Sequence, residues 1–258
     1  MRSIRTNFQQ QHRPKKSSLI IGQKKVIDAI QAGEQIERIY LSTSVNARVA
    51  DEVRNLAEEK QIPVNKVPIE KLNSFNVEHD GCVALRGKIR YQDLQQVISF
   101  VVDRGEVPLF LMLDGITDIR NIGAIARTAY CCGVHALVIP DKGVGALNDD
   151  AILTSAGALE KIPVCRVSSL MKAVDELHLN GIKVFASDMN ALKKLFDVDL
   201  KEPSAIIMGS EDKGVFPALL KVSDEVFNIP MKNNFDSLNV AVASGMILYE
   251  AMKQRMPA

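Results

Sequence analysis

From Pro108 onward, short apolar segments with the length of β-strands alternate with segments of helical spacing. Strands that are buried on both faces read as near-continuous apolar runs, because helices cover their sheet from either side. The alternation therefore predicts an α/β domain built on a parallel sheet. The expected strands are 109–113, 136–139, 162–167, 183–186, 205–208 and 225–229.

Residues 18–88 predict a second, smaller α/β domain ahead of this sheet. Its strand-like runs are 19–21, 38–41, 62–67 and 82–85, and helical spacing occurs at 24–32 and 46–60. The sequence turns polar after this domain, apart from one helix-like stretch at 94–102. We therefore expect a linker at 89–107 and a second domain at 108–258.

The basic residues are concentrated at the N-terminus. The first 27 residues carry seven bases and no acid, whereas the rest of the chain carries 25 bases against 31 acids, a net charge of −6. We expect residues 1–17 to form a flexible basic arm. Such an arm suits contact with a phosphate backbone, because each neutralised phosphate releases counterions. A solubilising tail is the equal alternative.

Several classes of protein are disfavoured by composition. Residues 1–14 are polar where a secretory signal needs an apolar core, and no apolar run approaches the ~20 residues of a membrane span. We therefore expect a cytoplasmic protein without a membrane segment. The four cysteines form no C-x-x-C pair and lie near no histidine cluster, which argues against a metal site and a disulfide framework.

Ligands of parallel sheets bind beyond the carboxyl ends of the strands, and three segments in such positions are unusual. The first begins at Asp114 and leads into a helix, 122–134, whose single charged residue is Arg127. We expect this helix to be buried nearly all round, and a buried guanidinium needs a carboxylate or phosphate partner. Arg127 either holds a phosphate or pairs with an internal acid such as Glu211.

The second segment, 209–214, follows the expected strand 205–208 directly and reads Gly-Ser-Glu-Asp-Lys-Gly. A strand that ends at a glycine lets backbone amides approach a ligand closely, and the carboxylate of Glu211 follows at once. Glycine-rich strand exits are common, so this pattern alone favours an ordinary loop.

The third segment runs from Ile229 through a polar turn into an apolar helix, 238–252. Ser237 is placed to cap this helix. The helix has few polar positions, which predicts that a partner buries it as well as its own sheet. A symmetric homodimer is the simplest source of that partner.

Three motifs in this order closely resemble the SpoU-type (TrmH) family of 2′-O-ribose RNA methyltransferases of the SPOUT class. They are N-x-G-A-x-x-R-T-A from Asn121, M-G-S-E-x-K-G from Met208, and I-P-M from Ile229 followed by S-L-N-V-x-V-A-x-G from Ser237. The resemblance covers most of residues 18–255 and is greatest to the branch that modifies a guanosine ribose in large-subunit ribosomal RNA. It implies a C-terminal SPOUT domain with a deep trefoil knot, an obligate homodimer, and a ribosomal-protein-like N-terminal domain that binds RNA.

The resemblance also implies roles for individual residues. The methyl donor, S-adenosyl-L-methionine, would bind without a metal at Met208, Gly209, Ile229, Met231 and Leu238. The catalytic residues around the transferred methyl would be Asn121, Arg127, Glu211, Ser237 and Asn239. A guanidinium is effectively never deprotonated in proteins. We therefore expect Arg127 to anchor the target phosphate, with Glu211 orienting Arg127 or Asn239, while that phosphate or a water accepts the hydroxyl proton.

The chain departs from the family pattern at two places. Ile119 stands where a proline is usual, and the segment 142–150 lacks the basic residues often found there. Asp149 and Asp150 are expected to repel RNA at that segment.

The favoured function is therefore methylation of a ribose 2′-hydroxyl in structured RNA, with ribosomal RNA preferred. Two alternatives remain on the same scaffold, namely a transfer-RNA ribose methyltransferase and a catalytically silent RNA-binding protein. A nucleotide-binding oxidoreductase is disfavoured, because the first strand of the large domain is followed by Asp114-Gly-Ile-Thr-Asp and not by a G-x-G-x-x-G turn.

Overall fold

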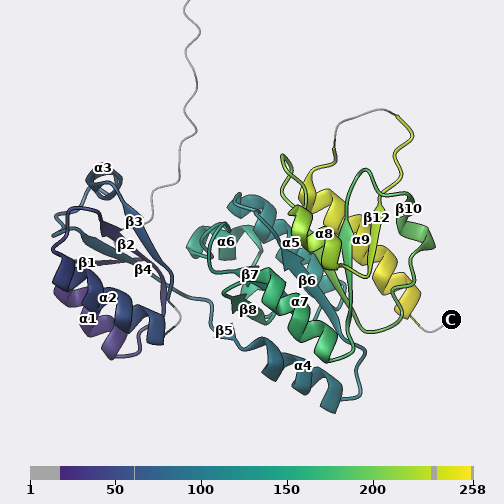
Figure 1. Ribbon diagram of the computed structural model, residues 1–258, viewed down its shortest axis with the longest axis horizontal. Coiled ribbons are helices and arrows are strands. Elements are labelled where there is room, and N and C mark those ends of the chain that lie inside the picture. The colour runs from purple at the N-terminus through teal and green to yellow at the C-terminus, as the bar shows by residue number, and fades with distance from the viewer. Residues whose placement is uncertain (1–17, 61, 234–236, 257–258) are drawn as a thin grey trace, which may run out of the picture. The chain divides into compact units, whose positions relative to one another are not determined.

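The structure is a computed structural model that describes residues 18–60, 62–233 and 237–256. The expected basic arm, 1–17, lies outside these residues. The chain divides into two compact units, and the boundary along the chain falls between Arg86 and Gly87 (Figure 1). Within the described ranges, no helix combines the length and apolar character that crossing a membrane requires.

The first unit is a small α/β domain whose four-stranded sheet has the order β1-β4-β2-β3. Its elements are β1 (Leu19–Ile21), α1 (Gln23–Gln31), β2 (Ile36–Ser42), α2 (Ala47–Glu59), β3 (Val64–Val67), α3 (Ile69–Asn73) and β4 (Cys82–Arg86). β4 runs antiparallel to β1 and β2, whereas β3 runs parallel to β2. The apolar sides of α1 and α2 share one core with the strands. The sequence predicted all of these elements except α3.

The second unit is a larger α/β domain. Its elements are β5 (Tyr91–Gln92), α4 (Leu94–Asp103), β6 (Leu109–Leu113), α5 (Ile119–Cys131), β7 (Ala136–Pro140), α6 (Asp149–Thr154), η2 (Ala158–Glu160), β8 (Val164–Val167), α7 (Leu170–Leu179), β9 (Lys183–Ser187), β10 (Lys193–Lys194), η3 (Leu195–Asp197), β11 (Ser204–Met208), α8 (Pro217–Val222), β12 (Glu225–Asn228) and α9 (Val240–Arg255). Its eight-stranded sheet has the order β10-β12-β9-β11-β6-β7-β8-β5. Every strand pair in it is parallel, which confirms the predicted sheet type.

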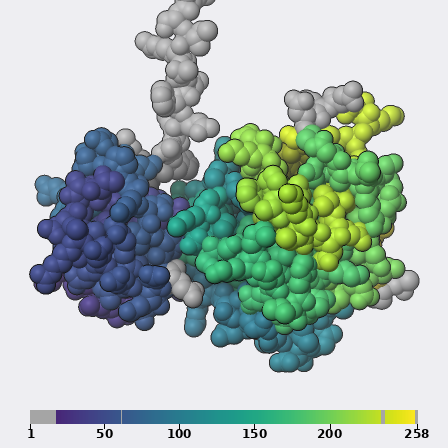
Figure 2. All heavy atoms as spheres, viewed as in Figure 1, coloured from purple at the N-terminus to yellow at the C-terminus, as the bar shows by residue number. Residues whose placement is uncertain are grey.

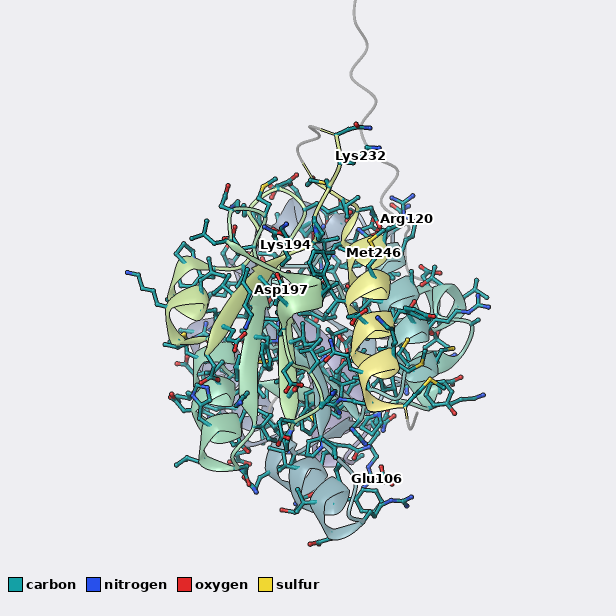
Figure 3. All side chains as sticks on the ribbon, turned by 90° about the vertical axis from the view of Figure 1, so that its right-hand side faces the viewer. Glu106, Arg120, Lys194, Asp197, Lys232 and Met246 are labelled. Atoms are coloured by element: carbon teal, nitrogen blue, oxygen red, sulfur yellow. The ribbon has the colours of Figure 1, made fainter. Side chains whose placement is uncertain are left out.

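Helices cover both faces of this sheet, as its near-continuous apolar strands predicted. Along β6, Leu111 and Leu113 face a core shared with α5 and α9, whereas Phe110 and Met112 face a core shared with α4, α7 and α8. In Figure 3 the strands lie between α9, drawn in yellow, and the green helices of the opposite layer. In Figure 2 the green and yellow-green atoms of that layer hide the strands from the viewer.

Residues 89–107 are not a linker, which corrects the sequence interpretation. Ile89 is buried, and Tyr91 and Gln92 pair with β8 as an edge strand. α4 buries Leu94, Val97, Ile98 and Val101 against the sheet. The polar residues that suggested a linker flank this helix, at 90–93 and 103–107, and most of them are exposed, so the pattern indicated solvent exposure and not a domain boundary.

Candidate active site at the carboxyl ends of the strands

Two neighbouring cavities lie where the parallel strands of the second unit end. The larger cavity, of about 440 Å³, is lined by the segments that follow β9, β11 and β12 and by the start of α9. The smaller cavity, of about 280 Å³, is lined by residues 115–118 after β6 and by Asn121 of α5. Residues 210–213 and Val240 belong to both linings, so one loop forms the common wall.

The segment that leaves β11, 209–216, has a tightly defined backbone. A Cβ atom on Gly209 would lie 2.0 Å from the carbonyl carbon of Gly214, so no larger residue fits there. Gly214 itself has φ +65°, the left-handed region that favours glycine. The carboxylate of Asp114, at the end of β6, accepts a hydrogen bond of 2.7 Å from the backbone N–H of Phe216. The two strand exits are thereby joined.

The carboxylate of Glu211 accepts hydrogen bonds from residues of α5 and from the start of α9. Its Oε1 accepts hydrogen bonds from Asn121 Nδ2 at 3.2 Å, from the backbone N–H of Val240 at 3.2 Å, and from Asn239 Nδ2. Asn239 Nδ2 also donates to Asn121 Oδ1 at 3.2 Å. Three of the five expected catalytic residues therefore form one network between the two cavities. Glu211 contacts Asn239, one of the two partners expected for it.

The five residues expected to bind the methyl donor all line the larger cavity: Met208, Gly209, Ile229, Met231 and Leu238. Ser237 lines it as well. The sequence interpretation missed Ser187, the last residue of β9, and Asp188 to Asn190, which follow it and complete the wall. The rule that parallel strands end at one edge would have found them, because β9 lies beside both β11 and β12.

Ser237 does not cap the last helix, which corrects its expected structural role. α9 begins at Val240, and the residue before it, Asn239, is the N-cap. Asn239 Oδ1 accepts hydrogen bonds from the N–H groups of Ala241 and Val242 at 3.1 and 3.3 Å. Asparagine caps a helix about as well as serine does. The cap that the sequence predicted therefore lies two residues further along.

Arg127 is exposed, which corrects the prediction of a buried guanidinium. α5 buries Ile122, Ile125 and Ala129, whereas Arg127 and Tyr130 lie on its open side. Arg127 lines neither cavity and has no acidic partner among the described residues, so the alternative in which it pairs with an internal acid such as Glu211 is wrong. The physical reason is helix geometry: six residues advance about 9 Å and turn about 240° from Asn121, onto a different side of the helix.

The acidic residues of segment 142–150 are partly neutralised. Asp149 forms an ion pair with Lys88 at 2.8 Å, and Asp149 and Asp150 lie in the first turn of α6, where the helix dipole favours negative charge. Hydrogen bonding and attraction to Asp149 raise the pKa of Lys88. The expected repulsion of RNA is therefore weakened at Asp149.

One ion pair lies at the mouth of the smaller cavity. Asp118, which lines it, caps α5 and accepts hydrogen bonds from Arg120 Nε and Nη2 at 3.2 and 2.9 Å. This hydrogen bonding lowers the pKa of Asp118, whose carboxylate is therefore charged at neutral pH. Among the described residues, no group of three histidine, cysteine, aspartate or glutamate side chains has the arrangement to hold a metal ion.

Comparison with known families covers both units. Residues 108–249 match the model of the SpoU rRNA Methylase family, and residues 19–92 match the model of RNA 2′-O ribose methyltransferase substrate binding. The TrmH family protein YacO of Bacillus subtilis (strain 168) is 31% identical over 239 residues, which cover 92% of this chain and 96% of YacO. A TrmH family protein of Staphylococcus haemolyticus is 32% identical over 238 residues, with the same coverage.

Solved structures agree with these matches. The SpoU methyltransferase AviRb from Streptomyces viridochromogenes, solved in complex with AdoMet, superposes with a TM-score of 0.58 at 25% sequence identity. The alignment covers 92% of this chain and 90% of AviRb. Together with the strand-exit geometry and the family match, this places the chain among known enzymes: it belongs to the SpoU rRNA methylase family of RNA 2′-O-ribose methyltransferases.

Proposed function

We propose that this enzyme transfers a methyl group from S-adenosylmethionine to a ribose 2′-hydroxyl of structured RNA, with ribosomal RNA preferred over transfer RNA. The observation that carries the proposal is the pair of cavities divided by the Glu211 network. A donor in the larger cavity and a ribose in the smaller one would meet at their common wall. The cytoplasmic location expected from the sequence remains a prediction.

The residues of the larger cavity fit this donor. Gly209 lets the backbone of Gly214 and Val215 pack closely against the end of β11, which shapes this part of the cavity wall, and apolar side chains such as Leu238 and Ile229 suit an adenine ring. Asp188 and Asn190 offer polar groups for the hydroxyls of a ribose. When bound, S-adenosylmethionine supplies a methyl group on a positively charged sulfur, which an oxygen nucleophile attacks.

The protein must position the RNA hydroxyl and provide for its proton. Asn121 lines the smaller cavity, and Asn239 is hydrogen-bonded to it, so that Glu211 holds both amide groups in fixed positions. Such preorganised groups orient a hydroxyl more effectively than mobile water does. A water or the RNA phosphate accepts the proton, because an arginine side chain is unsuited to act as a base.

We further propose that the enzyme is a homodimer built on the open sides of α5 and α9, which pack against each other. Tyr130, Val242, Met246 and Tyr249 leave apolar surface exposed there, and Figure 3 labels Met246 on this surface. A contiguous apolar surface of this kind is typical of a protein interface. Arg127 belongs to the same surface, which supports a role in the active site of the second copy.

We also propose the trefoil knot that the resemblance implies. The sheet order β12-β9-β11-β6 is far from sequential, and α9, which follows β12, returns to pack on α5, which follows β6. These crossings are compatible with a threaded chain. An experimental structure traced through residues 209–240 is the test.

Transfer of radiolabelled methyl groups tests the function. The purified enzyme is incubated with labelled S-adenosylmethionine and unmodified transcripts of large-subunit ribosomal RNA and of transfer RNA, and the position of 2′-O-methylation is mapped. Methylation of one ribose in the ribosomal transcript is the expected result. Methylation of transfer RNA alone would replace the proposed substrate, and RNA binding without any transfer would favour the silent RNA-binding protein.

Mixed dimers test the placement of Arg127. Chains with Arg127→Ala and chains with Glu211→Ala are expected to be inactive alone. If Arg127 serves the partner's site, a random mixture recovers roughly a quarter of wild-type activity, since half of the dimers are mixed and each has one intact site. Light scattering verifies that the mixed chains are dimeric. If such dimers recover no methyl-transfer activity, Arg127 does not serve the partner's site.

A further inference from the structure

Phe216 is an exposed aromatic side chain on a fixed backbone, two residues after Gly214, which lines the larger cavity. Its side chain is 59% exposed, and its ring makes no aromatic or cation–π contact among the described residues. Its backbone is nevertheless held on both sides. Its N–H donates to the Asp114 carboxylate, and its carbonyl accepts from the N–H of Leu219 at 2.8 Å.

The residue that follows Phe216 contributes further rigidity. Pro217 occupies the first position of α8, where its fixed φ suits a helix start. An apolar ring held in water on a rigid support loses little conformational entropy when a flat partner stacks on it. The ring is therefore preorganised for stacking, and the core of its own unit leaves it uncovered.

A basic side chain, that of Lys213, lies on the loop that leads to Phe216. Lys213 is exposed, lines both cavities, and its ammonium has no ion pair or hydrogen bond within the described ranges. Aromatic rings combined with basic side chains are the usual means by which proteins hold unpaired nucleotides, because every base has a π-face and every linkage a phosphate.

We propose that Phe216 stacks on an unpaired base adjoining the target nucleotide and that Lys213 contacts the neighbouring phosphate. This inference rests on the proposed function and assigns to the 213–216 segment a positioning role in RNA binding, distinct from the Glu211 network. An unpaired RNA base is favoured over a protein partner because Lys213, at the start of the segment, lines the cavity that would receive the ribose.

The test compares Phe216→Ala and Phe216→Trp with the control Phe100→Ala. Phe100, on α4, is 62% exposed and so matches Phe216 in exposure, and its ring carries only an intraunit contact with Arg104. α4 ends three residues before Glu106. Figure 3 labels Glu106 at one end of the unit and Arg120 and Lys232 at the other end. Methyl transfer to the unmodified ribosomal transcript gives KM and kcat separately.

We expect Phe216→Ala to raise the KM for RNA about tenfold with kcat retained, which corresponds to about 1.4 kcal/mol and lies within the range for one stacked base. Phe216→Trp should restore the KM, and Phe100→Ala should leave it unchanged. Lys213→Gln should reduce the dependence of log KM on log salt by about one unit. An unchanged KM in Phe216→Ala, or a loss of kcat alone, would overturn the proposal. So would a changed oligomeric state with unchanged RNA binding, which would indicate a protein contact.

A binding experiment separates this inference from the proposed function. A fluorescein-labelled RNA without secondary structure and an abasic oligonucleotide of the same length are titrated with each variant. Stacking predicts that Phe216→Ala weakens binding of the first probe but not of the abasic probe. If the wild type transfers no methyl group, the proposed function fails while this binding difference still supports stacking. If the wild type and Phe216→Ala bind the first probe equally well, stacking is refuted, even if the enzyme is active.

Discussion

Glu211 and Asn121 lie 90 positions apart in the sequence, and Glu211 Oε1 accepts a hydrogen bond from Asn121 Nδ2 at 3.2 Å. The contact joins the exit of β11 to the first turns of α5. Because the backbone N–H of Val240 donates to the same oxygen, the start of α9 is fixed to both. The wall between the two cavities is therefore one hydrogen-bonded unit assembled from three segments.

Removal of the Glu211 carboxylate should disable this unit. We expect Glu211→Ala to lower kcat about a hundredfold or more, since small misplacements of positioning groups have effects of that size. Steady-state methyl transfer measures the change. Asp175→Asn, an exposed acid on α7, is the control and should retain wild-type kcat. A kcat near wild type in Glu211→Ala would show that the two asparagines are positioned without it.

Asn239 combines capping of α9 with donation to Glu211 and Asn121, and one substitution separates these roles. In Asn239→Ser the hydroxyl still caps the helix, so the free energy of unfolding should stay within about 0.5 kcal/mol of wild type, whereas Asn239→Ala should lose about 1 kcal/mol. Both variants lack the Nδ2 donor and should lose methyl transfer. Denaturant unfolding and the transfer assay measure the two effects. An active Asn239→Ser enzyme would limit Asn239 to capping.

Gly209 leaves no room for a side chain. A Cβ in Gly209→Ala would lie 2.0 and 2.1 Å from backbone atoms of Gly214 and Val215, so the loop must shift. We expect binding of S-adenosylmethionine, measured by calorimetry, to be lost. Gly245→Ala is the matched control, because its Cβ would meet only Thr128 Cγ2 at 3.9 Å. Donor affinity equal to wild type in Gly209→Ala would remove this loop from the proposed donor site.

Because of two buried thiols, we expect the free energy of unfolding to fall at alkaline pH. Burial raises the pKa of Cys82 and of Cys165 to about 12, from 9.0. The folded protein thus holds these protons at pH values where the unfolded chain releases them, so the stabilisation is complete below pH 9 and declines as pH rises toward 12. Denaturant midpoints from pH 7 to 11 should fall beyond pH 9, and Cys82→Ala with Cys165→Ala should reduce the fall. A fall of the same size in the double variant would assign it to other groups.

The sequence alone determined the type of sheet and the position of the site. Near-continuous apolar runs such as 109–113 require burial on both faces, and the structure provides it. Because parallel strands end at one edge, the motifs that follow them had to meet there, and Met208, Gly209 and Glu211 line one cavity. These properties are local periodicities and chain order, which a sequence states directly.

Tertiary structure decided what each side chain faces. Arg127 looked buried because its neighbours along the chain are apolar, but the direction in which the helix turns places it on the open side of α5. Arg255 shows the opposite case: it is partly buried, and its guanidinium donates to the carbonyls of Leu200, Val107, Pro108 and Glu202. No spacing along the chain indicates such contacts. A residue's partners depend on how separate segments pack in space, which the order of residues does not record by itself.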